Sequence, residues 1–136
     1  MKYIGYYNGE FGPLEEMKVP MTDRALYFGD GCYDATYAVN HIPFALEDHL
    51  DRFYNSCRLL EIPFDMPREE LRDLLCQAAA MADGDESHMV YWQASRGSGL
   101  RNHLFPEPGV KPNLMITVRP IPMKPLDKPF RLISME

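Results

Sequence analysis

An arginine and a histidine lie two positions apart in the segment RGSGLRNHLFP, residues 96–106. If Leu100 to Leu104 is extended, Arg101 and His103 point the same way, because side-chain direction in a strand repeats every two residues. The arginine guanidinium offers a planar fork of donors that matches a carboxylate or a phosphate, and an imidazole adds a further donor. This pattern predicts a site for a small anion; the alternative is a solvated loop whose charges keep it in water.

A tyrosine and a second arginine are further candidates for anion binding. Tyr33 follows the sequence Gly-Asp-Gly, whose glycines allow a sharp turn into a strand that projects the phenol from its start. The alternative for Tyr33 is a half-buried core aromatic with a wet tip. Arg52 lies in EDHLDRFYNS, beside two aromatic residues that mark where a predicted helix meets the core. This position puts Arg52 either at the rim of a cleft or in a surface ion pair with Asp48 or Asp51.

The histidines and cysteines favour no metal site. His49 is interpreted as a helix-capping or surface residue. His41 and His88 lie in a predicted turn and at a predicted strand start, without a second ligand at a suitable spacing. The cysteines form an odd set with wide spacing and no C-x-x-C motif, which predicts neither a disulfide framework nor a zinc site and fits the reducing cytoplasm. They are Cys32, Cys57 and Cys76.

The composition is that of a single globular domain. The chain has 136 residues, of which 46% are apolar and 25% are charged. A net charge of −6, with 14 basic residues scattered among 20 acidic ones, argues against a nucleic-acid surface. No apolar stretch approaches the roughly 20 residues of a membrane helix, and the first residues lack the apolar run of an export signal. We therefore expect neither nucleic acid nor a membrane as a partner, and a cytoplasmic location.

The elements that must position the candidate residues follow from turn residues and apolar spacing. Asn8-Gly9 predicts a hairpin between residues 2–7 and 10–11. A short helical turn capped by Thr22 or Asp23 precedes a strand over CYDATYAV and a short strand over 42–45. Apolar residues at spacings of three and four predict a helix that starts near Leu46 and ends before Pro63. A second helix is predicted to begin at Pro67.

Further strands flank the segment that carries Arg101. HMVYWQAS and NLMITVRPIP are predicted as strands on either side of it, and FRLISM, residues 130–135, as a strand still running where the sequence stops. Strands that bracket two consecutive helices favour an α+β fold. The expected architecture is one mainly antiparallel sheet with two helices packed on one face.

Four segments, in this order and spacing, carry a resemblance to a known family. They are TDRALYFGDGCYDATYAVN, LEDHLDRFYNSCRLL, YWQASRGSGLRNHLFP and KPNLMITVRP. Together they resemble the small N-terminal domain of the class IV aminotransferases, the fold-type IV enzymes that depend on pyridoxal phosphate. The resemblance covers essentially the whole chain. The Arg-x-His element is most similar to that of the D-amino-acid aminotransferases, while branched-chain aminotransferases and aminodeoxychorismate lyases share the fold.

The resemblance implies a role for each candidate residue. Tyr33, Arg101 and His103 match the trap for the substrate α-carboxylate, and Arg52 matches the arginine that binds the phosphate of pyridoxal phosphate. The implied activity is exchange of an amino group between a D-amino acid and a 2-oxo acid. The implied assembly is a homodimer in which the Arg101 and His103 loop reaches the partner subunit's site. Alternatives are a lyase or branched-chain aminotransferase of the same fold, or a non-catalytic binding or dimerisation domain.

The resemblance also implies that part of the active site lies outside this sequence. In the family, the Schiff-base lysine and the partner of the pyridine nitrogen belong to a second, larger domain that begins shortly beyond the position of Glu136. No lysine of this chain matches that motif; the five are Lys2, Lys18, Lys111, Lys124 and Lys128. Residues 1–136 are therefore expected to be an N-terminal domain without catalytic residues of its own and inactive alone. A piece of a full enzyme is favoured over a natural stand-alone domain, because the candidate set has no evident purpose without the second domain.

Overall fold

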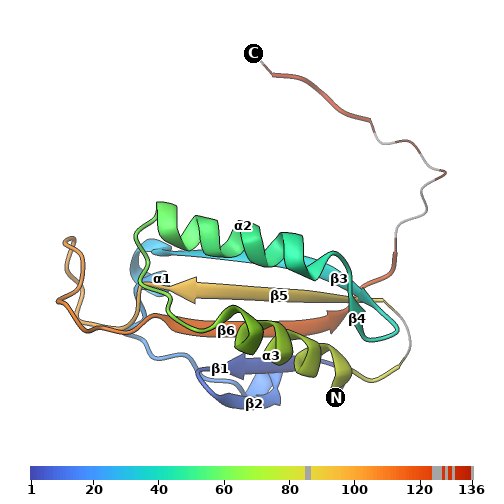
Figure 1. The fold of residues 1–136 in the computed structure, drawn as a ribbon, viewed down its shortest axis with the longest axis horizontal. Coiled ribbons are helices and arrows are strands. Elements are labelled where there is room, and N and C mark those ends of the chain that lie inside the picture. The colour runs from blue at the N-terminus through green and yellow to red at the C-terminus, as the bar shows by residue number, and fades with distance from the viewer. Residues whose placement is uncertain (85–86, 124–126, 128, 130, 136) are drawn as a thin grey trace.

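Six antiparallel strands form one sheet in the computed structural model, which describes residues 1–84, 87–123, 127, 129 and 131–135 (Figure 1). The strand order is β2-β1-β6-β5-β3-β4, so that the long strands β6, β5 and β3 lie side by side in the sheet. The bounds are β1 (Ile4–Tyr7), β2 (Glu10–Pro13), β3 (Gly31–Val39), β4 (Ile42–Pro43), β5 (His88–Ser95) and β6 (Asn113–Pro120).

Two long helices cover one face of this sheet (Figure 1). Helix α2 (Leu46–Leu59) packs on β3, and α3 (Arg68–Ala80) packs on β4, β5 and β6. A short helix, α1 (Arg24–Phe28), precedes β3, and a 3-10 turn, η1 (Leu14–Glu16), follows β2. The predicted α+β class, with a mainly antiparallel sheet and two helices on one face, is confirmed.

The core lies between the two long helices and the sheet because apolar side chains recur with the period of each element. In β3, residues 32, 34, 36 and 38 are buried while residues 33, 37 and 39 are exposed. Trp92 of β5 and Phe53 of α2 are fully buried and pack edge to face, with ring centroids 6.0 Å apart. Other core side chains come from the buried stripes of the helices, namely Leu46, Leu50, Cys57, Leu71, Leu75, Ala78 and Ala79.

Local turn chemistry sets the elements around the candidate residues. Asn8 and Gly9 both have positive φ, 45° and 105°, as the predicted hairpin requires. Asp23 caps α1, since its Oδ1 accepts a hydrogen bond from the Ala25 N–H at 2.9 Å. Gly29 then ends α1 with φ of 63°, so that the chain turns into β3.

Two sequence-based predictions are wrong. FRLISM is not a strand within the described residues: 131–135 have no regular structure, are exposed and lie away from the sheet, and Phe130 lies outside the described residues (Figure 1). A strand needs a neighbour for its backbone hydrogen bonds, and residues 131–135 pair with neither sheet edge. The segment from Leu100 to Leu104 is not extended either but contains bends. All three cysteines are free, as expected.

Gly31 occupies a position that has no room for a side chain. A Cβ at Gly31 would lie 2.5 Å from the Ala94 carbonyl oxygen and 3.2 Å from Ser95 Cα on the neighbouring strand. We expect Gly31→Ala to reduce the free energy of unfolding by about 1–3 kcal/mol, because the atoms that crowd the new Cβ belong to the β5 backbone, which cannot move aside without a cost in free energy. Urea denaturation measures this change. Gly99→Ala is the matched control, since a Cβ there meets nothing within 4 Å; an equal effect of both substitutions would contradict the crowding argument.

Candidate active site

The start of β3 is an open edge of the sheet that carries two polar side chains on opposite faces. β3 pairs with β5 from Gly31 to Ala38, but β4 pairs only with the last two residues of β3. Within the described residues, no strand therefore covers the outer edge of residues 31–36. Tyr33 and Asp34 are neighbours on this edge, and consecutive strand residues point to opposite faces. Tyr33 therefore lies on the exposed face of β3 and Asp34 on the buried one.

Tyr33 is on the face that α2 and α3 leave uncovered. Its side chain is 65% exposed, and its ring stacks on that of Tyr91 with centroids 5.2 Å apart and an interplanar angle of 27°. Tyr91 in turn donates a hydrogen bond to Gln93 Oε1 at 2.6 Å. Among the described residues, the Tyr33 hydroxyl makes no hydrogen bond. Tyr33 is thus a fixed surface phenol rather than the half-buried core aromatic that the sequence left open.

Arg52 pairs with a carboxylate that the sequence analysis did not consider. Its Nε and Nη2 donate to Asp34 Oδ2 and Oδ1, both at 2.7 Å, which is a two-bond fork. The proposed partners in the same helix, Asp48 and Asp51, do not bind it. His49 Nδ1 also lies 2.8 Å from Asp34 Oδ1, so His49 belongs to this cluster and is not the capping or surface residue that its position in the sequence suggested.

The surroundings of Asp34 keep its carboxylate charged. Its side chain is 1% exposed, and this burial acts to raise the pKa. The hydrogen bonds from Arg52, His49 and the Ala35 backbone N–H, together with the positive charge of Arg52, outweigh burial, so that the pKa of Asp34 is lowered overall. In turn, the Asp34 carboxylate raises the pKa of Arg52. The pair is therefore ionised at neutral pH.

One edge of the Arg52 guanidinium remains available. The side chain is 66% exposed, and Asp34 occupies only the Nε and Nη2 edge. Within the described part of the chain, Nη1 of Arg52 makes no hydrogen bond. An arginine held on one edge by a buried carboxylate, with its other edge in solvent, fits a phosphate group as ligand. The residues at this position thus fit the phosphate of pyridoxal phosphate.

The Asp34 cluster predicts an acid-dependent stability. A carboxyl group with a lowered folded pKa stabilises the fold above its unfolded pKa, about 3.9, and this contribution disappears as the pH falls through the folded value. We expect Asp34→Asn to lower Tm by at least about 5 °C at pH 7. The difference from the unchanged chain is expected to shrink below about pH 4.

Melting curves followed by circular dichroism at several pH values measure this difference. Asp48→Asn is the matched control, because Asp48 is an exposed acid in the first turn of α2, the helix that carries Arg52. A Tm difference for Asp34→Asn that stays constant from pH 7 to pH 3 would show that the stabilisation is not electrostatic.

Arg101 and His103 lie against the same aromatic ring. Arg101 Cζ is 5.1 Å from the centroid of the Phe28 ring, and the His103 ring centroid is 5.6 Å from it. Both side chains are exposed, and neither has an acidic partner among the described residues. The alternation of an extended strand does not bring them together, since the segment bends. Phe28, at the end of α1, is the residue that gathers them, and the sequence analysis did not single it out.

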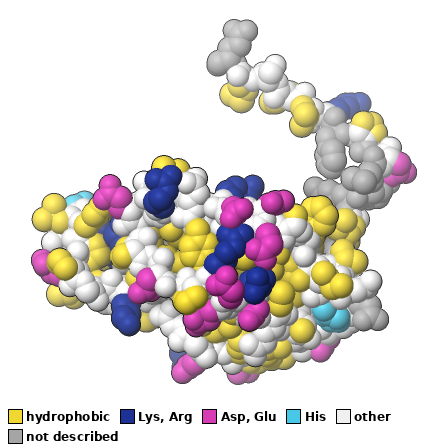
Figure 2. All heavy atoms as spheres, viewed as in Figure 1, with side chains coloured by type: hydrophobic (Ala, Val, Ile, Leu, Met, Phe, Trp, Pro, Cys, Tyr) yellow, Lys and Arg dark blue, Asp and Glu magenta, His cyan; other side chains and the backbone are white. Residues whose placement is uncertain are grey.

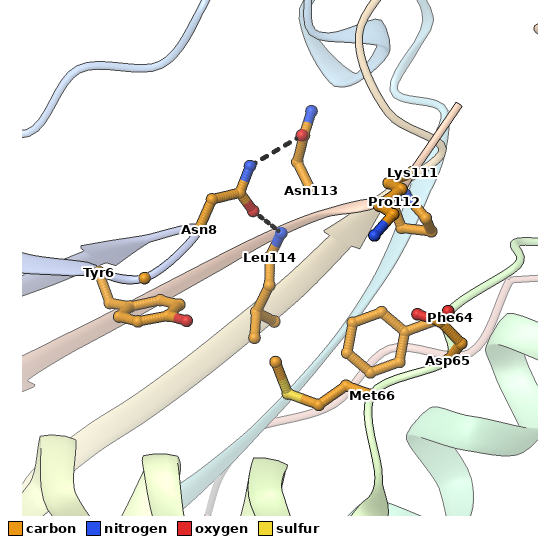
Figure 3. Close-up of a pocket in the computed structure, with 10 residues that line it drawn as sticks. Tyr6, Asn8, Phe64, Asp65, Met66, Lys111, Pro112, Asn113 and Leu114 are labelled. Atoms are coloured by element: carbon orange, nitrogen blue, oxygen red, sulfur yellow. Dashed lines mark hydrogen bonds between the residues drawn. The ribbon is translucent and has the colours of Figure 1, made fainter. Parts of the chain in front are cut away.

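The structure does not bring the four candidate residues into one closed pocket. Tyr33 stacks on Tyr91, Arg52 binds Asp34 on the helix side, and the other two residues lie at Phe28. A hollow of about 420 Å³ lies between the β1–β2 turn and the connection from α2 to α3, and it contains none of the four (Figure 3). Its lining includes Tyr6, Asn8, Phe64, Met66 and Leu114. Within one chain, the candidate residues form separate exposed groups.

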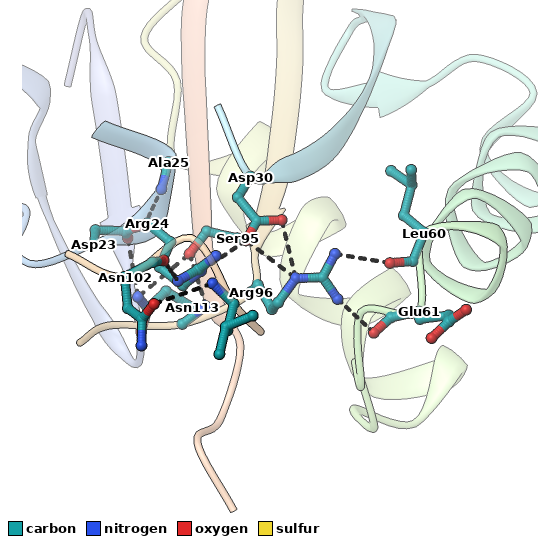
Figure 4. A network of polar contacts seen from close by, with 12 residues as sticks. Asp23, Arg24, Ala25, Asp30, Leu60, Glu61, Ser95, Arg96, Asn102 and Asn113 are labelled. Atoms are coloured by element: carbon teal, nitrogen blue, oxygen red, sulfur yellow. Dashed lines mark hydrogen bonds and ion pairs between the residues drawn. The ribbon is translucent and has the colours of Figure 1, made fainter. Parts of the chain in front are cut away.

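A buried ionic network that contacts the Arg101 loop was not predicted from the sequence (Figure 4). Arg24 and Arg96 are each 5% exposed and both bind the carboxylate of Asp30. Asp30 is the central residue of Gly-Asp-Gly. The two glycines of this sequence predicted a sharp turn, but no role was predicted for Asp30. Arg96 lies 66 positions from Asp30 in the sequence, and no local pattern distinguishes a buried arginine from a surface one.

The surface of the two long helices carries charges of both signs. Figure 2 shows acidic and basic side chains interspersed over α2 and α3, where Arg68 and Arg72 pair with Glu47 at 2.9 and 3.6 Å. In the described part of the chain, no three His, Cys, Asp or Glu residues are grouped so as to hold a metal ion. No helix among the described residues is long and apolar enough to cross a membrane.

The structure is an α+β domain that carries exposed arginine and histidine side chains at its surface. Residues 31–134 match the model of the family described as amino-transferase class IV. The matched region contains β3, α2, α3, β5 and β6, and thus all four candidate residues. The chain belongs to the class IV aminotransferases, which in general depend on pyridoxal phosphate.

Individual relatives agree with this assignment. The chain is 34% identical over 125 residues to a D-alanine aminotransferase of Staphylococcus haemolyticus, covering 92% of the chain and 42% of that protein. It is 30% identical over 121 residues to a putative branched-chain-amino-acid aminotransferase of Methanocaldococcus jannaschii, covering 89% of the chain and 41% of that protein. The chain thus spans about two fifths of the length of these relatives.

Solved structures show the same fold. The branched-chain amino acid aminotransferase of Escherichia coli matches with a TM-score of 0.76 at 19% identity, covering 87% of this chain and 40% of that one. The 4-amino-4-deoxychorismate lyase of Pseudomonas aeruginosa matches with a TM-score of 0.70 at 28% identity, covering 89% and 41%. The fold is therefore that of a domain shared by enzymes that are named for different activities.

Proposed function

We propose that this chain is the N-terminal domain of a two-domain transaminase that exchanges an amino group between a D-amino acid and a 2-oxo acid. In this proposal Arg101, His103 and Tyr33 bind the substrate α-carboxylate, and Arg52 binds the cofactor phosphate. The observation that carries it is the pair of exposed donors at Phe28 with no acidic partner among the described residues. The D-alanine aminotransferases at 34% identity support the choice of substrate.

Carboxylate binding by Arg101, His103 and Tyr33 would provide both affinity for the substrate and discrimination between its enantiomers. Each hydrogen bond to a charged group contributes roughly 1.5–3 kcal/mol. A carboxylate fixed on one side of the cofactor also fixes where the remaining groups on Cα point. With the carboxylate and amino group so placed, only one enantiomer would point its Cα–H bond to the side of the cofactor from which the proton is removed. Placement of the carboxylate therefore selects D- over L-amino acids.

The Arg52 cluster is the proposed phosphate site. Asp34 holds the Nε and Nη2 edge of Arg52, and the opposite edge binds the phosphate while Asp34 prevents the guanidinium from swinging away. Pyridoxal phosphate, when bound, supplies the electron sink for bond breaking at Cα and stores the amino group between the two half-reactions. The lysine that carries the cofactor belongs, in this proposal, to a second domain outside these 136 residues.

We propose further that the Arg101 and His103 loop serves the site of the partner subunit in a homodimer. The separation of the candidate residues within one chain supports this arrangement. At subsaturating D-alanine and pyridoxal phosphate, co-expression of Arg52→Gln and Arg101→Ala subunits is expected to give activity above that of either variant homodimer. A mixed dimer with loops acting across the interface contains one site free of both substitutions. If mixed dimers show no activity above that of the parent variants, the loop acts within its own subunit.

A substrate panel on the two-domain enzyme tests the proposed function. The candidate donors are D-alanine, L-alanine and L-leucine, with 2-oxoglutarate as acceptor, and formation of the new amino acid is followed by chromatography. We expect transamination of D-alanine at least about 100-fold faster than of L-alanine, a difference of about 2.7 kcal/mol between the two hands. Preference for L-leucine, or cleavage of aminodeoxychorismate without transamination, would assign the site to one of the related enzymes instead.

A further inference from the structure

Arg24 connects the buried network to the segment between Arg101 and His103 (Figure 4). Its Nε donates to Asp30 Oδ2 at 2.7 Å, and its Nη1 donates to the Asn102 carbonyl oxygen at 3.0 Å. The Arg24 side chain is almost fully buried, whereas its partner Asn102 is an exposed residue. One guanidinium therefore joins the turn before β3 to the loop.

The bond to Asn102 is the main anchor of this part of the loop. Within the described part of the chain, it is the one hydrogen bond that joins residues 100–104 to the rest of the structure. The Asn102 carbonyl belongs to the planar peptide that leads into His103, so holding it restricts that peptide. Arg24 Cζ also lies 5.0 Å from the Phe28 centroid, on the same ring that Arg101 and His103 contact.

Asp30 gives Arg24 a rigid support. Its carboxylate also accepts from Arg96 Nε at 3.0 Å, and Arg96 donates to the carbonyl oxygens of Leu60 and Glu61 at 2.8 and 2.7 Å. These carbonyls follow directly on the end of α2, the helix that carries Arg52. The chain of contacts thus runs from α2 through Arg96 and Asp30 to Arg24 and the loop. Every link is a hydrogen bond to a charged group, the stronger kind in proteins.

We propose that Arg24, supported by Asp30, is a positioning residue for substrate binding: it holds the Asn102 carbonyl so that Arg101 and His103 are presented together at Phe28. This inference rests on the proposed function, in which the pair binds the substrate carboxylate. Holding the loop in the binding conformation removes an ordering cost that substrate binding otherwise has to meet. Arg24 itself makes no contact with substrate in this proposal.

The substitution Arg24→Lys tests this role because it keeps the charge but not the fork. A lysine ammonium reaches Asp30 or Asn102 but does not span both. In the 136-residue chain, ¹⁵N relaxation is expected to show backbone order parameters at residues 101–103 falling from about 0.85 to below about 0.6. In the two-domain enzyme, KM for D-alanine is expected to rise about tenfold while affinity for pyridoxal phosphate stays the same. Arg58→Lys, on the exposed face of α2, is the control for both measurements.

The two readouts separate this inference from the proposed function. Unchanged order parameters in Arg24→Lys overturn the positioning role, whatever the substrate is. If the loop becomes mobile in Arg24→Lys but KM for D-alanine is unchanged, Arg101 and His103 do not bind the substrate carboxylate. Positioning of these residues by Arg24 then has no effect on substrate binding. If Arg24→Lys does not fold, Asp30→Asn, which loosens Arg24 from its support, is measured in the same way. The inference is supported only if loop mobility and KM rise together.

Discussion

Replacing Arg101 with alanine in the two-domain enzyme is expected to raise KM for D-alanine by about 10- to 100-fold. The substitution removes a hydrogen bond from a charged donor to a charged acceptor, and each such bond is worth roughly 1.5–3 kcal/mol. Since every 1.4 kcal/mol corresponds to about a factor of ten, the expected range follows directly. Arg101 is exposed and lies on Phe28 without an ion pair among the described residues, so its removal leaves no buried charge behind.

Steady-state kinetics at saturating cofactor measures the effect of Arg101→Ala. His103→Ala is expected to act in the same direction, and the double variant to exceed either single one. Arg58→Ala is the control, because Arg58 is an exposed arginine whose side chain binds only Asn55 of the same helix among the described residues. Unchanged KM values in both Arg101→Ala and His103→Ala would remove these residues from the carboxylate site.

Replacing Arg52 with glutamine is expected to raise the dissociation constant for pyridoxal phosphate by about 10- to 100-fold. The free edge of the guanidinium is the proposed phosphate contact, and bonds between arginine and phosphate are among the strong, charge-assisted kind. KM for D-alanine at saturating cofactor is expected to change little, because the carboxylate is bound elsewhere. Titration of the apoenzyme, followed by cofactor absorbance, gives the dissociation constant.

Two further variants make the Arg52 result specific. Arg52→Gln leaves the buried Asp34 carboxylate without its arginine partner. The double variant Asp34→Asn, Arg52→Gln removes that charge as well, and so shows whether the loss of cofactor affinity persists without it. Arg68→Gln is the control for a general effect of surface charge, because Arg68 pairs with Glu47 on the outer side of the helices. Cofactor affinity that is equal in all these variants would contradict the phosphate assignment.

The secondary structure was largely predictable because it depends on local patterns. Asn8-Gly9 defined the first hairpin, apolar spacing located both long helices, and HMVYWQAS matches β5 (His88–Ser95) residue for residue. The sheet order and the pairing of β3 with β5 depend on contacts between distant segments. Those contacts leave no periodic signal in one sequence. The predicted strand at FRLISM failed because strand propensity says nothing about whether a neighbour is available.

The candidate residues could be recognised in the sequence from their residue types, but their hydrogen-bond and ion-pair partners could not. Arg52 was assigned partners in its own helix, whereas its actual partner, Asp34, is 18 positions away on β3. Arg24 and Arg96 gave no signal, because a buried arginine is tolerated only where tertiary structure supplies carboxylates and carbonyls. The sequence therefore indicated candidate side chains for anion binding, whereas the groups that hold these side chains in place are visible only in the folded structure.

Reductive trapping of the cofactor tests most directly the claim that this chain supplies the anion-binding part of a divided active site. The 136-residue chain is incubated with pyridoxal phosphate, reduced with borohydride and examined by intact mass and peptide mapping, with the two-domain enzyme as positive control. We expect no site-specific adduct on the chain alone and one adduct, beyond Glu136, in the two-domain enzyme. A single stoichiometric adduct at Lys2, Lys18, Lys111, Lys124 or Lys128 would contradict this expectation and would give this domain a cofactor lysine of its own.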